Sequence, residues 1–179
     1  APLSIDDLCA RFRATGEVPF YLAESPERVA SQRLVWRGEL SDARAALTRL
    51  LAVADERGEP SSYALQRLHV CELELRAGDW PAAERLLDEW AQSADRELLL
   101  WPMYERCRAL VAAGRGEPNE AERWAAEAIV RADETGVRWD RFESLRSLGI
   151  VDLLRQEPEK AAERLRGVWE HMEREGIED

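Results

Sequence analysis

Three arginines occupy equivalent positions in this sequence, and their chemistry suits the binding of an anion. Arg28, Arg106 and Arg146 each lie fifteen residues before an alanine. A guanidinium presents a planar fork of N–H donors that matches a carboxylate. In a chain of net charge −11, arginines gathered inside a concavity would bind an acidic ligand or a peptide terminus. The alternative is that each arginine pairs with a neighbouring acid, such as Glu143 or Glu72.

No residues of the sequence form a catalytic pattern. His69 and His171 have no cysteine or serine partner at a motif spacing, and no Gly-x-Ser-x-Gly sequence occurs. We expect both histidines to be helix-surface or partly buried residues. The sequence therefore predicts no catalytic residues and no enzyme activity. The alternative is a small-molecule enzyme whose turnover would have to depend on one of the two histidines.

The cysteines predict neither a disulfide framework nor a metal site. Cys9, Cys71 and Cys107 are odd in number and widely spaced, and no Cys-x-x-Cys pair is present. We expect no cofactor and a reducing, cytoplasmic environment. No run of eighteen apolar residues and no signal peptide occurs, so we expect no membrane contact.

The composition favours a helical protein. Charged residues make up 34% of the chain and hydrophobic residues 45%. Valine and isoleucine are sparse, and no stretch alternates as a strand would. The net negative charge argues against direct contact of this chain with nucleic acid or with an anionic membrane. We predict an all-α fold.

An internal repeat organises the sequence. Its clearest marker is an alanine that recurs at spacings of 40, 38 and 40 residues, at Ala43, Ala83, Ala121 and Ala161. Each alanine lies five residues after a turn-like position, namely Gly38, Gly78, Gly116 and Gln156. A repeat at this period is typical of stacked helical hairpins. We therefore predict a right-handed superhelix of about four hairpins, which is usually a binding surface.

Further positions keep the same register. Twelve residues before each alanine the side chain is small, at Ser31, Cys71, Ala109 and Gly149. Small residues at this separation can face each other across a hairpin and let two helices approach closely. Four and seven residues after the alanine the side chains are apolar, at Leu47 and Leu50, Leu87 and Trp90, Ala125 and Ala128, and Leu165 and Val168. These positions continue one face of the second helix.

The elements follow from these markers. We expect hairpins over about 26–57, 61–95, 102–135 and 140–175, in one continuous array from 25 to 179. Residues 1–24 lie outside the register, with a short helix from Ser4 to about Thr15. This segment is either a cap or the second helix of an earlier hairpin. The chain starts at Ala1 without a methionine, so we expect a piece of a longer protein.

The last helix keeps an apolar face. Leu165, Val168, Trp169 and Met172 lie at helical spacing, whereas a terminal solenoid repeat normally presents a polar surface. We expect either a following repeat or a homodimer contact through the terminal helices.

Several stretches resemble known helical repeats. Gly78-Asp79-Trp80-Pro81-Ala82-Ala83, together with Leu148-Gly149, resembles a tetratricopeptide hairpin, although the period exceeds the usual 34 residues. The longer period is similar to that of the MalT-like helical region of large ATP-dependent LuxR-type regulators of the actinobacterial kind. The stretches that carry this likeness are 44–58, 72–78, 109–116, 146–150 and 175–177.

The resemblance implies a groove and a function. In tetratricopeptide geometry the arginine position faces a concave groove, which would be lined by Arg28, Gln32, Leu68, Glu72, Met103, Arg106, Leu110, Glu143, Arg146 and Ile150. The family implies a sensor module that binds an effector or a protein partner inside a bacterial transcription regulator. ATP binding and DNA binding would belong to flanking parts of that regulator, since no phosphate-binding loop occurs here. The alternative is a free-standing protein–protein interaction scaffold.

Overall fold

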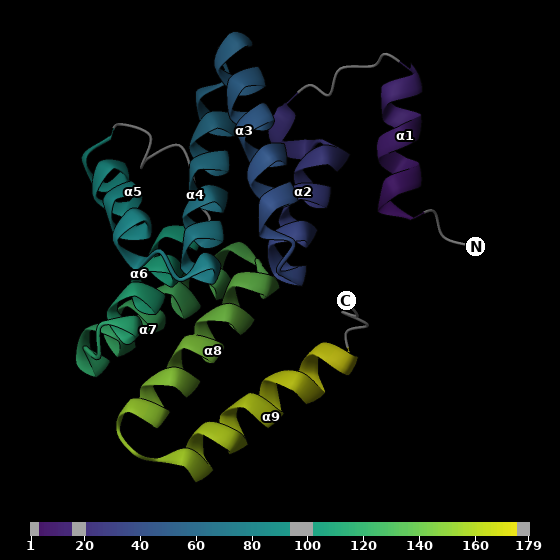
Figure 1. Cartoon of the computed structure of the whole chain (residues 1–179). Helices are drawn as coiled ribbons and strands as arrows, with labels where there is room; N and C mark the ends of the chain where they lie inside the picture. Colours follow the sequence, from purple (N-terminus) through teal and green to yellow (C-terminus); the bar gives the residue numbers. More distant parts are fainter. Residues whose placement is uncertain (1–3, 16–20, 94–101, 175–179) are drawn as a thin grey trace. The chain divides into compact units, whose positions relative to one another are not determined.

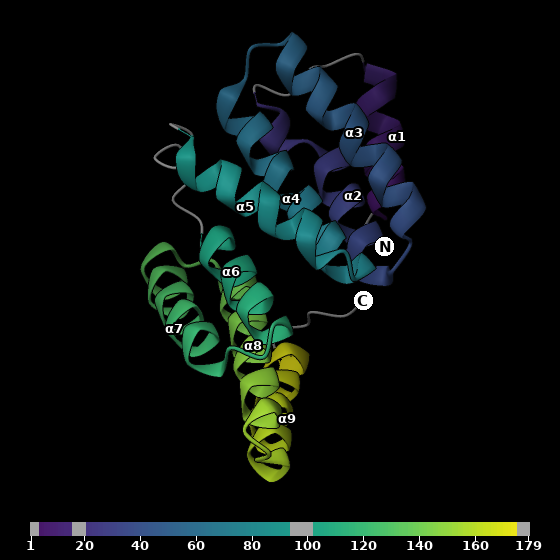
Figure 2. The ribbon, with the colours of Figure 1, turned by 60° about the vertical axis from the view of Figure 1, so that its left-hand side comes forward.

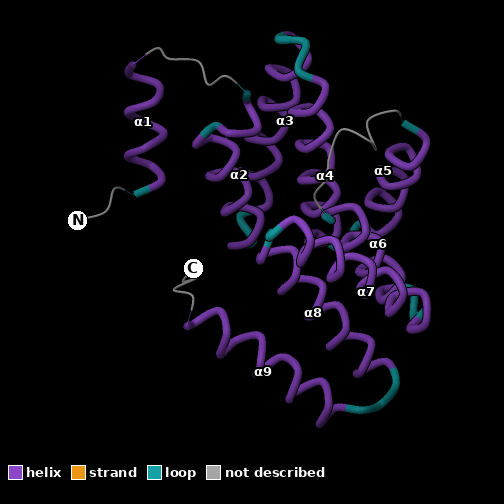
Figure 3. The backbone as a smooth tube through the Cα atoms, turned by 180° about the vertical axis from the view of Figure 1, so that it is seen from behind, coloured by secondary structure: helices purple, strands orange, loops and turns teal. Residues whose placement is uncertain are grey.

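The computed structural model describes residues 4–15, 21–93 and 102–174. All secondary structure in these ranges is helical, which confirms the all-α prediction (Figure 3). The chain divides into two compact units, 1–99 and 100–179, and each is described by itself. The predicted single array over 25–179 would join these units, and it stays a prediction.

Unit 1 contains a short helix followed by two hairpins (Figure 1). Its elements are α1 (Ile5–Thr15), the 3₁₀ turn η1 (Leu22–Glu24), α2 (Pro26–Arg37), α3 (Leu40–Glu56), α4 (Pro60–Ala77) and α5 (Trp80–Gln92). Each helix packs against the next described helix, and α4 also contacts α2 and η1. Helix α4 is therefore the central element of this unit.

Unit 2 repeats the hairpin pattern (Figure 2). Its elements are α6 (Met103–Gly114), α7 (Pro118–Thr135), α8 (Arg138–Leu154) and α9 (Pro158–Arg174). Helix α8 packs on α6 as well as on α7 and α9. The first helix of one hairpin thus contacts the first helix of the next, as it does in unit 1.

The hairpin turns lie at the four positions that the repeat marks. Backbone φ is 77° at Gly38, 80° at Gly78, 74° at Gly116 and 63° at Gln156. This left-handed conformation ends a helix and is easy for glycine. Gln156 adopts it despite its side chain, and it is the only non-glycine residue with positive φ in the described ranges. The positive φ of Gly58 and Gly136 marks the turns between hairpins, and Gly176 lies outside the described residues.

The start of α1 is capped as expected. The Asp7 backbone N–H donates to Ser4 Oγ at 3.1 Å, and Ser4 Oγ donates to Asp7 Oδ2 at 2.8 Å. The Ser4 backbone N–H also donates to Asp7 Oδ2 at 3.3 Å, so two backbone donors at the start of the helix have partners.

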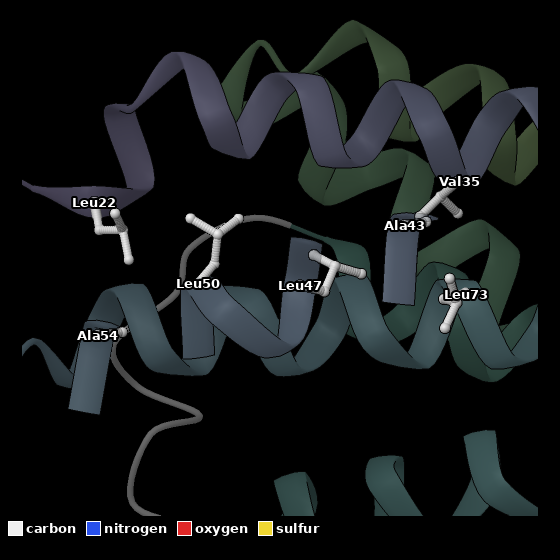
Figure 4. Close-up of a cluster of buried hydrophobic side chains, with 7 residues drawn as sticks. All are labelled: Leu22, Val35, Ala43, Leu47, Leu50, Ala54 and Leu73. Carbon is white, nitrogen blue, oxygen red and sulfur yellow. The ribbon is translucent and has the colours of Figure 1, made fainter. Parts of the chain in front are cut away.

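The core of each unit is built on the repeat positions. Figure 4 shows the unit 1 cluster, which contains Leu22, Val35, Ala43, Leu47, Leu50, Ala54 and Leu73. In unit 2 a smaller cluster contains Ala112, Ala113, Ala121 and Val151. All eight marker positions are buried: Ser31, Ala43, Cys71, Ala83, Ala109, Ala121, Gly149 and Ala161. The Cys71 thiol lies 3.6 Å from the Ala83 carbonyl oxygen, so this pair does meet across its hairpin.

Candidate ligand-binding site

The predicted groove residues of unit 2 form a buried ion-pair network. The Arg106 side chain has no exposed area, and its Nε lies 2.8 Å from Asp140 Oδ1. Its Nη1 lies 3.5 Å from Glu143 Oε2, and Arg146 Nη2 lies 2.6 Å from the same oxygen. The two Arg106 contacts join α6 to α8, whereas the Arg146 contact lies within α8. Arg106 and Arg146 are therefore paired with carboxylates of the chain itself, which was the alternative to binding an acidic ligand.

The remaining unit 2 residues of the predicted groove do not add an open anion site. Met103 and Leu110 are buried in α6, and Ile150 is half-buried beside the unit 2 cluster. Arg146 keeps 39% of its side chain exposed, but it shares Glu143 with Arg106. Burial of an ion pair with good geometry costs desolvation, so these contacts serve mainly to fix the packing of α6 on α8.

The unit 1 part of the predicted groove has a different composition. Arg28 Nε donates to the carbonyl of Ala23, and Arg28 Nη1 donates to Gln32 Oε1 at 3.2 Å. Leu68 and Glu72 are each 2% exposed in α4. The Glu72 carboxylate accepts a hydrogen bond from Trp36 Nε1 at 3.2 Å and lies 3.5 Å from Arg76 Nη2. Whether the two halves line one groove concerns both units and stays a prediction.

One histidine, His69, is more buried than predicted, whereas His171 is partly buried as expected. His69 is only 2% exposed, because it lies on the central helix α4 of unit 1. His171 packs against the Phe142 ring with 5.1 Å between ring centroids. In the described part of the chain no group of three or more His, Cys, Asp or Glu side chains is arranged to hold a metal ion. None of the described helices is long and apolar enough to cross a membrane.

The residues that sequence reasoning missed surround a cavity in unit 1. This space, of about 460 Å³, lies among α1, η1, α2 and α3. Apolar side chains form most of its wall: Cys9, Phe12, Leu22, Ala30, Leu34, Ala46, Leu50 and Val53. Its charged residues are Asp6, Arg13, Glu27, Arg49 and Arg57. The sequence signals for this wall are the apolar spacing of Cys9 and Phe12 on the first helix and the apolar repeat position of Leu50.

Cys9 is a buried thiol in this wall, with 4% exposure. Burial is the largest cause that raises the pKa of Cys9, the Glu27 carboxylate raises it further, Arg13 opposes this, and Asp6 adds the smallest upward effect. The thiol is therefore protonated at neutral pH, and a protonated thiol is a poor nucleophile. The cavity is suited to reversible binding of an apolar molecule rather than to covalent chemistry.

Comparison with known proteins assigns neither a family nor a ligand to this chain. No model of a known protein family matches the sequence, and no curated protein matches it.

Proposed function

We propose that this chain is a non-enzymatic sensor module that binds a small apolar effector in the unit 1 cavity. The cavity volume and its apolar wall carry this proposal, because ligand sites of this size are concave and largely apolar. The sensor would belong to a LuxR-type transcription regulator with a superhelical array of tetratricopeptide-like hairpins. Its surroundings would be cytoplasmic, and contact with DNA would be made by another part of that regulator.

The mechanism follows from the elements that bound the cavity. Helix α1 packs on α2, and α2 packs on α3. A ligand among these three helices would favour the state in which α1 is docked. By differential affinity it would shift the population toward that state and toward whatever activity of the regulator depends on it.

The test uses the neutral fluorescent dye N-phenyl-1-naphthylamine, which becomes bright in apolar surroundings. We expect saturable binding of one dye per chain. Ala46→Phe should abolish it, because this residue lines the cavity and the larger ring would fill the space. Ala45→Phe is the matched control, since Ala45 is exposed on the same helix and does not line the cavity. Equal binding by both variants, or none by the parent chain, would refute the proposal.

The second candidate function is a protein–protein scaffold, and the apolar face of α9 favours it. Trp169 is 63% exposed and Leu165 is 37% exposed. Leu165 and Leu47 occupy the same repeat position, four residues after the marker alanine, and Leu47 is fully buried in unit 1. We propose a second copy of the chain as the partner. Sedimentation should then show a dimer that Trp169→Lys dissociates, while Val130→Lys, at another exposed apolar site, leaves it intact.

A further inference from the structure

The charged residues around the unit 1 cavity differ in whether they already have partners. Arg57 Nη2 lies 2.6 Å from Glu59 Oε1, and Arg13 Nε donates to the Cys9 carbonyl at 3.1 Å. Among the described residues, Asp6, Glu27 and Arg49 have neither a hydrogen bond from their side chains nor an ion pair. Because a carbonyl does not neutralise Arg13, the charges at the cavity without an opposite partner are two carboxylates, Asp6 and Glu27, and two guanidiniums, Arg13 and Arg49.

The Glu27 carboxylate is the least exposed of these four charged groups. Asp6 extends from α1 and Glu27 from α2, and both act electrostatically on the Cys9 thiol, which is 4% exposed. No hydrogen bond of the Cys9 thiol is made within the described residues, and the thiol lines the same cavity. Glu27 is half-buried, whereas Asp6, Arg13 and Arg49 are exposed, so Glu27 is the main carboxylate of this wall and Asp6 a secondary one. Charges near a buried wall interact more strongly than charges in water.

Two further features favour a positive ligand. The ring of Phe12 lines the cavity, and an aromatic face attracts a cation. The chain as a whole carries a net charge of −11, which raises the local concentration of cations and lowers that of anions.

We infer that the unit 1 cavity takes a lipophilic organic cation, meaning an apolar body that carries one protonated amine. The apolar wall would bury the body, and the carboxylates of Asp6 and Glu27 would hold the ammonium group. This inference rests on the proposed function, because it names the chemical class of effector for the same cavity.

The experiment measures displacement of N-phenyl-1-naphthylamine from the full chain at pH 7 by three naphthalenes of one shape. They are 1-naphthylmethylamine, which is protonated, 1-methylnaphthalene, which is neutral, and the carboxylate 1-naphthaleneacetate, which is anionic. We expect the amine to bind about tenfold more tightly than the neutral compound, and the acetate to bind most weakly. A tenfold preference is what one charge-assisted hydrogen bond in a partly buried site provides.

Variants then assign the preference to the carboxylates. Glu27→Gln and Asp6→Asn should each reduce the preference for the amine about threefold, and the double variant should remove it. All three should still bind the neutral dye, which shows that they are folded. Asp42→Asn is the matched control, because Asp42 is exposed on α3 and does not line the cavity.

The outcomes separate this inference from the function on which it rests. A chain that binds the dye but prefers the acetate, or shows no preference, overturns the cation and leaves the effector cavity standing. An amine preference that survives the double variant also overturns it. A chain that binds no dye refutes the cavity as a binding site altogether.

Discussion

The two units place an arginine at the same repeat position but surround it differently. In unit 1 the partners of Arg28 are the Ala23 carbonyl and Gln32, which are uncharged. In unit 2 the partners of Arg106 are the carboxylates of Asp140 and Glu143. The arginine itself is therefore not what decides between an open site and a structural ion pair.

The difference comes from the first helix of the next hairpin. Twenty-one and eighteen residues before the marker alanine, the second hairpin has Ser62 and Leu65, whereas the fourth has Asp140 and Glu143. Ser62 Oγ accepts from the Ala23 backbone N–H at 3.1 Å and donates to Glu59 at 2.6 Å. At the first of these positions, unit 1 thus joins η1 to α4 through the neutral hydroxyl of Ser62, whereas unit 2 joins α6 to α8 through the buried carboxylate of Asp140.

The largest expected effect is the loss of the unit 2 ion pairs. Arg106→Met leaves Asp140 and Glu143 buried without this cation, so we expect the free energy of unfolding of unit 2 to fall by about 3–5 kcal/mol. Hydrogen exchange followed by mass spectrometry resolves the two units, and the amides of α6 and α8 should lose protection. Arg28→Met is the matched change in unit 1. It removes hydrogen bonds to neutral acceptors in η1 and α2, so we expect a loss of about 1–2 kcal/mol that is seen in these two elements.

The comparison fails if the two arginine variants cost the same. The double variant Arg106→Met with Asp140→Leu sharpens the test, since removing both charges should recover part of the lost stability.

The second prediction compares equivalent leucines on α3 and α9. Leu47 is fully buried, so Leu47→Ala should lower the free energy of unfolding of unit 1 by about 2–5 kcal/mol. Leu165 is 37% exposed, so Leu165→Ala should cost unit 2 about 1 kcal/mol or less. Urea unfolding monitored by exchange in each unit measures both. Equal costs would mean that another surface covers α9 in solution, and the cost of Leu165→Ala should then depend on protein concentration.

The helices were predictable from the sequence because their signals are local. The turns at Gly38 and Gly78, the proline at the start of several helices and the cap at Ser4 each depend on a few neighbouring residues. The predicted hairpin of 26–57 matches α2 and α3 closely. The small residues at the marker positions likewise followed from the repeat alone.

The sites were less predictable because they depend on contacts between helices. The arginine positions followed from the repeat, but the choice of Asp140 as the partner of Arg106 depends on how α8 packs against α6. The cavity wall joins residues of α1, which lies outside the repeat register, to residues of α2 and α3. No spacing in the sequence connects Cys9 with Leu50, so this site required the tertiary structure.

The third prediction concerns the acid dependence of unit 2. Asp152 is buried in α8, where Arg164 Nε lies 2.7 Å from Oδ2 and Lys160 Nζ lies 3.0 Å from Oδ1. Burial raises the pKa of Asp152, but these hydrogen bonds outweigh it, and the pKa lies below its ordinary value. A lowered pKa in the folded state stabilises the fold above the unfolded value of about 3.9. That stabilisation is lost as the pH falls through the lower folded pKa.

Asp152→Asn should therefore lower the stability of unit 2 by about 1–3 kcal/mol at pH 7 and by progressively less below pH about 4. Unfolding measured from pH 7 to pH 3 checks this convergence. Glu122→Gln is the control, because Glu122 pairs with Arg155 2.7 Å away but is 53% exposed, and its effect should be smaller. Parallel pH profiles for the parent chain and Asp152→Asn would contradict the assignment.

The smallest expected effect tests the close approach of α8 and α9 at Gly149. A Cβ atom added there would lie 3.0 Å from Leu165 Cδ2, whereas one added at Gly167 would meet nothing within 4 Å. Alanine is a better helix former than glycine, so Gly167→Ala should stabilise unit 2 by about 0.5–1 kcal/mol. Gly149→Ala should gain at least ~0.5 kcal/mol less, because the Leu165 side chain must shift.

A double-mutant cycle identifies the cause of that difference. When Leu165→Ala has already removed the crowding methyl groups, Gly149→Ala should stabilise unit 2 as much as Gly167→Ala does. If Gly149→Ala gives the same small gain in both backgrounds, contact with Leu165 is not what restricts this position. If the gain recovers, the absence of a side chain at Gly149 is what allows Leu165 of α9 to lie this close to α8.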